Sequence, residues 1–287
     1  MGRRVHLLAL AASSIAGCTL LVDSSGLTTP GGDRAGVSDA ASDGPLPADA
    51  DPAEAADVQD ARDVDAPAIH PYVQAVLADG PSLYYRLEET SGTIAKDETG
   101  NHPGTYLSGG GHGAAGAFPG SSALRLSGPG GVSSGDIFDF EGTVAFTLEA
   151  WLRPEGYDDQ YRFLFHHNDE SGLRQNYGIY VQATNGLTFE RYVDGDGRAA
   201  STQKPDVGSW HHIVGVYTGA AIQLYLDGTL VSASPDPRAA KEKRSILTIG
   251  FGYPGGEGAL KGTLDELAVY EKALDQDRIA AHFHAAQ

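Results

Sequence analysis

The sequence predicts an all-β fold for residues 71–287, an antiparallel β-sandwich with short helices at its two ends. Short β-branched, aromatic or alternating runs recur through this region and are separated by Gly, Pro, Asn and Asp. Antiparallel strands joined by turns produce this pattern. The length of the region suits one sandwich domain. The runs that we interpret as strands are SLYYRLEE, SALRLS, AFTLEAWLRP, YRFLFHH, YGIYVQA, GLTFERYV, WHHIVGVY, AIQLYLDG, SILTIGF and GTLDELAVY.

The segment AFTLEAWLRP shows the strand pattern most clearly. Phe146, Leu148, Ala150 and Leu152 share one face, and the residues between them share the other, as the two-residue period of a strand requires. We therefore expect the first face to line the core and the second, which includes Trp151, to be semi-exposed.

One hairpin and two helices complete the predicted elements. In IQLYLDGTLVSAS, Asp227 and Gly228 can adopt the positive φ values of a tight type I′ turn between two apolar runs. PYVQAVLADG at the start of the domain and LDQDRIAAHFHAA at its end read as helices, the second with Asp275 as its N-cap.

Residues 1–17 have the pattern of an export signal. Arg3 and Arg4 form a positive start, and the apolar run of 5–16 is too short to span a bilayer as a mature helix. We predict a signal peptide here.

The only cysteine in the chain, Cys18, follows this segment directly, so no intramolecular disulfide can form. Ile15-Ala16-Gly17-Cys18 resembles the bacterial lipobox, in which the cysteine is lipidated and becomes the mature N-terminus. The resemblance implies a lipid-anchored protein of the bacterial cell envelope, and Thr19 implies sorting to the outer membrane where the cell has one. The alternative is an ordinary secretory signal with an incidental cysteine.

Residues 18–70, which begin with the cysteine predicted to be lipidated, are rich in Ala, Asp, Pro, Gly and Ser and nearly free of aromatic residues. Such a composition cannot bury enough apolar surface to fold, so we expect a disordered acidic linker that its own charge extends. The net charge of the whole chain is -18, which excludes nucleic acid as an expected partner.

Four segments of residues 71–287 resemble successive blocks of a laminin-G-like, concanavalin A-like jelly-roll domain, in the family's order. The resemblance implies two curved antiparallel sheets, a concave face or loop rim used for binding, and often a calcium ion. Members of the family recognise carbohydrates or proteins. The expected partner is therefore a glycan or an envelope or extracellular protein. The four blocks are AVLADGPSLYYRLEETSGTIAKDETGNHPGTY, FTLEAWLRP, WHHIVGVYTGAAIQLYLDGTLV and LKGTLDELAVYEKALDQDRIAAHF.

The same resemblance implies that Asp97 and Asp265 lie near one another as calcium ligands, because similar domains place an acid at each of these positions. Calcium binds six to eight oxygen atoms. Asn101 and Glu266 are weaker candidates, since Glu266 should point to the opposite face from Asp265. The alternative is that Asp97 forms an Asx turn and Asp265 accepts hydrogen bonds from backbone.

Sheet-face residues are the first candidates for ligand contact. An exposed aromatic ring can stack on a sugar while a polar side chain bonds its hydroxyl groups. The alternative is that the aromatic residues only pack the sheet. The predicted ligand-binding residues are Trp151, Arg153, Tyr180, Tyr217 and Tyr225.

Loop tips are the competing location, because binding residues are often carried by loops on a rigid scaffold. The candidates there are Tyr157, Asp158, Tyr253 and Glu257.

Motifs of enzymes match poorly. G-x-S-x-G at 131–135 lacks the strand before and the helix after that a nucleophile elbow requires. G-x-G-x-x-G at 111–116 is followed by Pro119 and Gly120 where a helix should begin, so we interpret it as a glycine-rich loop. Related glycoside hydrolases carry an E-x-D-x-x-E array, and Glu149 has no acid two residues later.

Histidine pairs do not predict zinc. His166 and His167, and His211 and His212, are strand neighbours that point to opposite faces, and the two histidines at 282 and 284 do not share a helix face.

The sequence therefore predicts a non-catalytic, surface-tethered binding module, for carbohydrate in the first place, with a calcium-stabilised loop. A protein–protein adhesion module of the cell envelope is the alternative, and a glycoside hydrolase is the third hypothesis.

Overall fold

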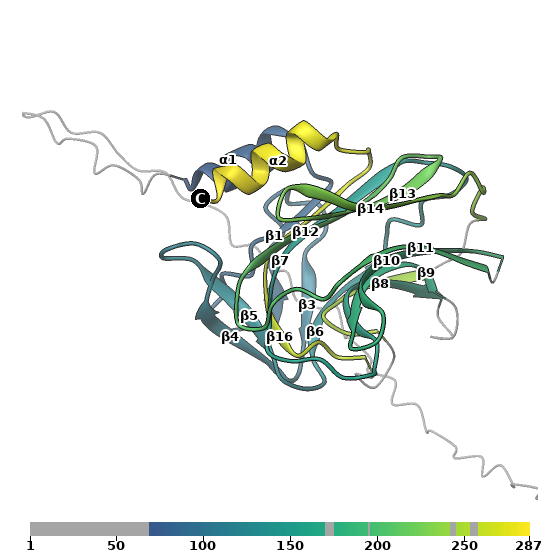
Figure 1. Cartoon of the computed structure of the whole chain (residues 1–287). Helices are drawn as coiled ribbons and strands as arrows, with labels where there is room; N and C mark the ends of the chain where they lie inside the picture. The colour runs from purple at the N-terminus through teal and green to yellow at the C-terminus, as the bar shows by residue number, and fades with distance from the viewer. Residues whose placement is uncertain (1–68, 170–174, 195, 242–244, 253–257) are drawn as a thin grey trace, which may run out of the picture. The chain divides into compact units, whose positions relative to one another are not determined.

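The structure is a computed structural model, and all the residues that it describes belong to one compact unit, Asp63–Gln287 (Figure 1). The predicted signal peptide, Cys18 and nearly all of the predicted linker lie outside the described residues. No helix among the described residues is long and apolar enough to cross a membrane. The structure describes residues 69–169, 175–194, 196–241, 245–252 and 258–287.

Two antiparallel sheets form the domain, which confirms the predicted all-β sandwich. Sheet A consists of β1 (Leu83–Tyr85), β4 (Gly110–Ala115), β5 (Ser122–Leu126), β7 (Phe146–Pro154), β12 (His211–Tyr217), β13 (Ala221–Leu226), β14 (Thr229–Pro235) and β16 (Gly262–Tyr270). Its order is β14-β13-β12-β7-β16-β5-β4, and β1 also pairs with β16.

Sheet B has eight strands in the order β11-β10-β9-β8-β15-β6-β3-β2. The bounds of these strands are β2 (Ile94–Ala95), β3 (Gly104–Leu107), β6 (Gly131–Asp136), β8 (Arg162–Asp169), β9 (Gln175–Gln182), β10 (Gly186–Val193), β11 (Asp196–Thr202) and β15 (Ser245–Ile249).

Helices α1 (Pro71–Ala78) and α2 (Gln276–Ala285) lie side by side over sheet A, on the side away from sheet B (Figure 1). Both predicted helices are confirmed. Asp275 caps α2, as predicted, because its side chain accepts a hydrogen bond from the backbone N–H of Arg278 at 2.8 Å.

The main core lies between the sheets and includes Phe146, Leu148, Ala150 and Leu152, as the alternation in β7 predicts. The expectation that the opposite face of β7 is semi-exposed is wrong. That face carries Trp151, which belongs to a second apolar cluster between sheet A and the two helices. A period of two identifies the faces of a strand but cannot show that a helix from elsewhere covers one of them.

The predicted hairpin is confirmed. Asp227 and Gly228 join β13 to β14 with φ values of 51° and 74°, the left-handed conformation that a type I′ turn requires.

The two glycine-containing motifs lie in strands. The G-x-S-x-G segment falls in β6, so it forms no strand-to-helix elbow. The G-x-G-x-x-G segment falls largely in β4 at the edge of sheet A, so our interpretation of it as a loop is wrong. The strand pairs antiparallel with β5, with a shift in register between Gly111 and Ala114.

Candidate functional site

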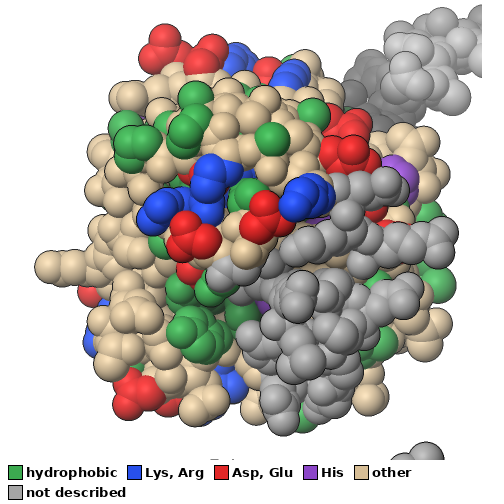
Figure 2. Space-filling view, turned by 90° about the vertical axis from the view of Figure 1, so that its right-hand side faces the viewer, with side chains coloured by type: hydrophobic (Ala, Val, Ile, Leu, Met, Phe, Trp, Pro, Cys, Tyr) green, Lys and Arg blue, Asp and Glu red, His purple; other side chains and the backbone are tan. Residues whose placement is uncertain are grey.

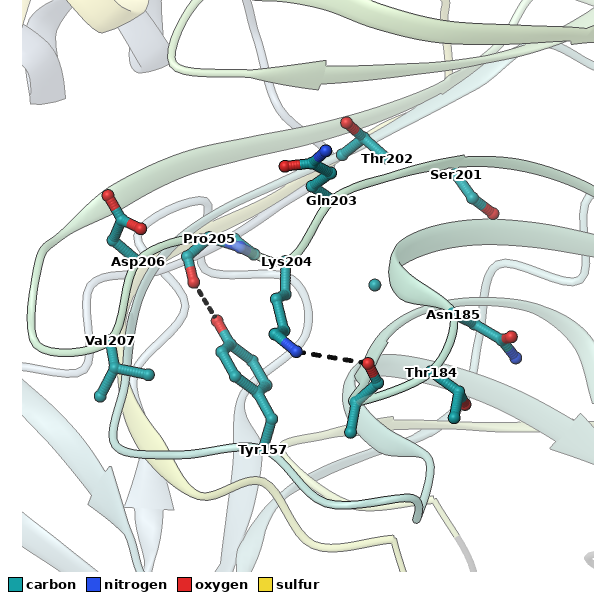
Figure 3. Close-up of a pocket in the computed structure, with 12 residues that line it drawn as sticks. Tyr157, Thr184, Asn185, Ser201, Thr202, Gln203, Lys204, Pro205, Asp206 and Val207 are labelled. Atoms are coloured by element: carbon teal, nitrogen blue, oxygen red, sulfur yellow. Dashed lines mark hydrogen bonds between the residues drawn. The ribbon is translucent and has the colours of Figure 1, made fainter.

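A polar groove of about 660 Å³ lies at one end of sheet B (Figure 3). Three connections meet at this end, because β8 starts, β9 ends, β10 starts and β11 ends at neighbouring register positions. The lining residues are Tyr157 from the β7–β8 connection, 183–186 from the β9–β10 turn, and 201–207 from the end of β11 and the following loop.

Gly186 lines the groove where β10 begins beside the end of β11. Its φ is 71°, and a Cβ atom there would lie 2.0 Å from the carbonyl oxygen of Thr202. Only glycine permits both this backbone conformation and this close approach. Asn185, beside it, donates a hydrogen bond from Nδ2 to Oε1 of Gln182 at 2.6 Å, which holds the turn to the end of β9.

Tyr157 forms one wall of the groove. Its hydroxyl donates to the carbonyl oxygen of Pro205 at 2.7 Å, so the tyrosine ties the β7–β8 connection to the loop after β11 (Figure 3). Burial raises the pKa of Tyr157, and the negative charge of Asp206 raises it further. The hydroxyl therefore stays protonated and keeps this bond over the physiological pH range.

Exposed polar side chains border the remaining space. Amide, hydroxyl, ammonium and carboxylate groups can all form hydrogen bonds here, and one aromatic ring stands beside them. A few polar groups around an aromatic wall form a site suited to a small hydroxylated ligand. The exposed polar side chains are those of Thr184, Asn185, Ser201, Gln203, Lys204 and Asp206.

Asp158, next to Tyr157, does not line the groove but holds the β7–β8 connection in place through its ion pairs. Its carboxylate pairs with Arg162, with an Nε–Oδ1 distance of 2.9 Å, and with Nζ of Lys261 at 2.7 Å. These bonds hold the pKa of Asp158 well below its usual range, and the bond from Arg162 has the largest effect. Of the four predicted loop-tip residues, Tyr157 thus lines the groove and Asp158 supports it, while Tyr253 and Glu257 lie outside the described residues.

The four aromatic residues predicted to contact a ligand are at most 5% exposed. Trp151 and Tyr225 lie under the helices, Tyr217 lies in the main core, and Tyr180 packs edge-on against Tyr161 at 5.0 Å. The expectation that these rings are exposed is wrong, and the alternative that they pack the sheet describes their contacts.

Arg153, the fifth predicted ligand-binding residue, is half-buried at the end of β7. Its guanidinium lies over the ring of Trp210, 5.2 Å from the centroid, and reaches the hydroxyl of Thr263. Arg153 does not line the groove.

Asp97 organises the loop after β2. Its two carboxylate oxygens accept hydrogen bonds from the backbone N–H groups of Tyr84, Thr99, Asn101 and His102 and from the hydroxyl of Thr99. Burial alone would raise the pKa of Asp97, but these bonds lower it. A cation would have to displace donors whose hydrogen atoms already point at the carboxylate.

Asp265 is fully buried in β16, where Oδ2 accepts a hydrogen bond from the backbone N–H of Ala117 at 2.8 Å. Burial, and then the neighbouring Glu266, raise the pKa of Asp265 well above its usual range. Glu266 accepts hydrogen bonds from Tyr84 and Arg86.

These contacts do not fit a calcium ion held by Asp97 and Asp265. Among the residues that the structure describes, no three or more His, Cys, Asp or Glu side chains form a group that could hold a metal ion. The described contacts match the alternative in which Asp97 orders a turn and Asp265 accepts backbone hydrogen bonds.

A buried polar cluster that the sequence did not reveal lies beneath the helices. The carboxylate of Glu149 accepts hydrogen bonds from the hydroxyl groups of Tyr72 and Tyr270, at 2.9 and 2.8 Å. Nε2 of His212 lies 2.8 Å from the same carboxylate, and Nδ1 of His282 lies 3.0 Å from it. Comparing only neighbouring histidines could not show that His212 and His282 meet, because they come from β12 and α2.

The pKa values of Glu149 and His282 indicate that the cluster contains an ion pair in the interior of the domain. Burial alone would raise the pKa of Glu149, but His282 and His212 lower it below its usual range. Burial alone would lower the pKa of His282, but Glu149 and Asp79 raise it. The cluster thus joins both helices to sheet A through an ionised carboxylate, and its enclosed position gives it a structural role.

The fold is a jelly-roll sandwich with a polar groove at one end of sheet B. Residues 126–280, more than half of the chain, match the family model Laminin_G_3, and the chain belongs to this family of the concanavalin A-like lectin/glucanase superfamily. The superfamily includes both lectins and glucanases. No curated protein matches the chain.

Solved structures share the fold at low sequence identity. Domain 4 of AbnA, a GH43 extracellular arabinanase from Geobacillus stearothermophilus solved with arabinotriose, has a TM-score of 0.56 and 19% identity. The match covers 72% of this chain and 98% of that domain.

Two further matches come from longer proteins. The binding domain of Paraclostridial Mosquitocidal Protein 1 has a TM-score of 0.55 and 17% identity, over 72% of this chain and 52% of that one. The sialidase of Trypanosoma rangeli has a TM-score of 0.52 and 15% identity, over 70% of this chain and 32% of the enzyme. At these identities the likeness establishes the fold alone.

Proposed function

We propose that residues 71–287 form a non-catalytic glycan-binding domain, and that the groove between Tyr157, the β9–β10 turn and residues 201–207 is its binding site. The single observation that carries this proposal is the composition of the groove, an aromatic wall beside exposed amide, hydroxyl and charged groups. Its volume of about 660 Å³ lies within the range of small-ligand sites.

Two comparisons support a sugar as the ligand. The family description includes lectins, and one solved structure of the same fold, the AbnA domain, is a complex with arabinotriose. The fold alone does not identify a ligand, so the proposal depends on the chemistry of the groove.

Binding to a polysaccharide panel tests the proposal. We expect the full chain, kept soluble in detergent, to be retarded by at least one neutral or acidic polysaccharide in affinity electrophoresis. The double variant Asn185→Ala/Gln203→Ala removes two exposed amides of the groove and should weaken that binding about tenfold or more, since a hydrogen bond contributes roughly 0.5–1.5 kcal/mol. We expect no new reducing ends after prolonged incubation.

Gln74→Ala, which removes an exposed amide of α1, is the matched control and should bind like the wild type. Absence of binding to the whole panel would contradict the proposal. If the chain then binds an envelope protein from which all glycans have been removed, the adhesion hypothesis replaces it.

We further propose that the domain is exported and held at the bacterial cell envelope by acyl chains on Cys18, with residues 18–70 as the tether. The lipobox-like sequence Ile15-Ala16-Gly17-Cys18 supports this proposal. Cells grown with a clickable palmitate analogue should label the wild-type chain and leave Cys18→Ser unlabelled. Equal labelling of both chains would contradict it.

A further inference from the structure

We infer that the groove accepts an acidic sugar residue, and that the ammonium group of Lys204 binds the carboxylate or sulfate of that residue. This inference rests on the proposed function and specifies the class of glycan.

Lys204 is unusual among the cations of this domain. Ten of the thirteen Lys and Arg side chains within the described residues form an ion pair with a carboxylate. In an acidic protein such pairing is expected, because carboxylates outnumber cations 38 to 20. The three described exceptions are Arg153, which stacks on Trp210, Lys272, which donates to a backbone carbonyl, and Lys204 in the groove.

The face in Figure 2 illustrates the general rule. Acidic and basic side chains lie next to one another across the middle of this face. Such neighbours neutralise each other, as the pairs of Asp196 with Arg198 and Arg238 and of Asp194 with Lys241 do. A cation such as Lys204, which forms no ion pair with a carboxylate of the described residues, is therefore a local departure from the pattern.

The position of Lys204 leaves its donors available. An ammonium group has three N–H donors. One is directed to the carbonyl oxygen of Ala183 at 3.4 Å, a long hydrogen bond, and the ring of Tyr157 lies beside the group with its centroid 5.8 Å from Nζ. These two contacts place the ammonium group between two walls of the groove and leave two N–H donors for a ligand.

Asp206 also lines the groove, but its carboxylate points away from the ammonium group. Figure 3 shows the side chain of Lys204 extending toward Tyr157, and that of Asp206 extending in the opposite direction. Asp158, which follows Tyr157, is paired with Arg162 and Lys261, so its charge is compensated by those two cations. Lys204 is thus the one described cation that lines the groove.

Matched polymers test the inference. The probes are polygalacturonate and its carboxyl-reduced form, and dextran sulfate and unmodified dextran, each titrated against the full chain in detergent. We expect at least one anionic polymer to bind about tenfold or more tightly than its neutral partner, with affinity falling as salt increases. The carboxylate and sulfate pairs show which anion the site prefers.

Variants assign the effect to the lysine. Lys204→Gln should lose about tenfold in affinity for the anionic polymer, the effect of one charge-assisted hydrogen bond. It should bind the neutral polymer as the wild type does, and Lys204→Arg should keep most of the affinity. Lys96→Gln changes the net charge equally at an exposed position next to β2 and should bind like the wild type.

The outcomes separate this inference from the proposed function. Equal binding of anionic and neutral polymers, or equal loss in Lys204→Gln and Lys96→Gln, would overturn the acidic-sugar inference and leave glycan binding intact. Absence of binding to every polysaccharide, neutral or acidic, would overturn both.

Discussion

Glu149→Ala is expected to lower the free energy of unfolding by about 3–5 kcal/mol, the usual cost of removing one partner from a buried charged network. The substitution leaves the hydroxyl groups of Tyr72 and Tyr270 and the imidazoles of His212 and His282 without their shared acceptor. Because Tyr72 lies in α1 and His282 in α2, both helices lose an attachment to sheet A. Urea unfolding followed by tryptophan fluorescence measures the change, since Trp151 lies in the same apolar cluster.

Glu141→Ala is the matched control, because Glu141 is exposed. It should change the free energy of unfolding by less than about 0.5 kcal/mol. A loss below about 1 kcal/mol in Glu149→Ala would show that the helices are held by their apolar contacts alone.

The pH dependence of the free energy of unfolding gives a second test of the buried Glu149 cluster. The pKa of Glu149 is lower in the folded chain than its ordinary value of 4.5, so its contribution is present above that pH and is lost as the pH falls. The difference in stability between wild type and Glu149→Ala should therefore shrink as the pH is lowered below about 4.5. A difference that is constant down to pH 3 would contradict an ionised Glu149.

Asp97→Ala is expected to cost about 2–4 kcal/mol, because four backbone N–H groups and one hydroxyl lose their acceptor and water can replace it for only some of them. The wild-type thermal midpoint should be the same in chelator and in millimolar calcium, since the carboxylate oxygens of Asp97 are already occupied by donors. Thermal unfolding in both solutions measures both effects.

Asp159→Ala, at an exposed position, is the control for Asp97→Ala. An ion that binds only the folded chain raises the midpoint by mass action. A calcium-dependent rise in the wild type that is absent in Asp97→Ala would therefore contradict the turn-forming role of Asp97 and establish the calcium site that the family resemblance implies.

The fold could be predicted because its signals are local. The alternation in β7 identifies the core face, and Asp227-Gly228 identifies a hairpin, each from a few adjacent residues. The outer face of sheet A could not be predicted, because its cover comes from α1 and α2 at opposite ends of the described domain. Trp151 and Tyr225 therefore lie on the strand face that the sequence predicts to be exposed, but the two helices bury them.

The groove could be predicted only in part for the same reason. The sequence predicts Tyr157 as a binding residue at a loop tip. Its neighbours in the groove come from two other connections, which only the register of β8 to β11 brings together. The polar run STQKPDVGS contains Lys204 and reads as an ordinary solvent-exposed loop. Its significance depends on the absence of a paired carboxylate among the described residues, which no sequence pattern encodes.

Hydrogen–deuterium exchange of the full chain, with and without the polysaccharide that binds most tightly in the panel, tests the central claim most directly. If the groove is the glycan site, segments 183–186 and 201–207 and the backbone around Tyr157 should exchange more slowly in the complex, while α1 and α2 stay unchanged. Slower exchange confined to other surfaces, with these three segments unaffected, would show that the glycan binds elsewhere and would contradict the assignment of the groove.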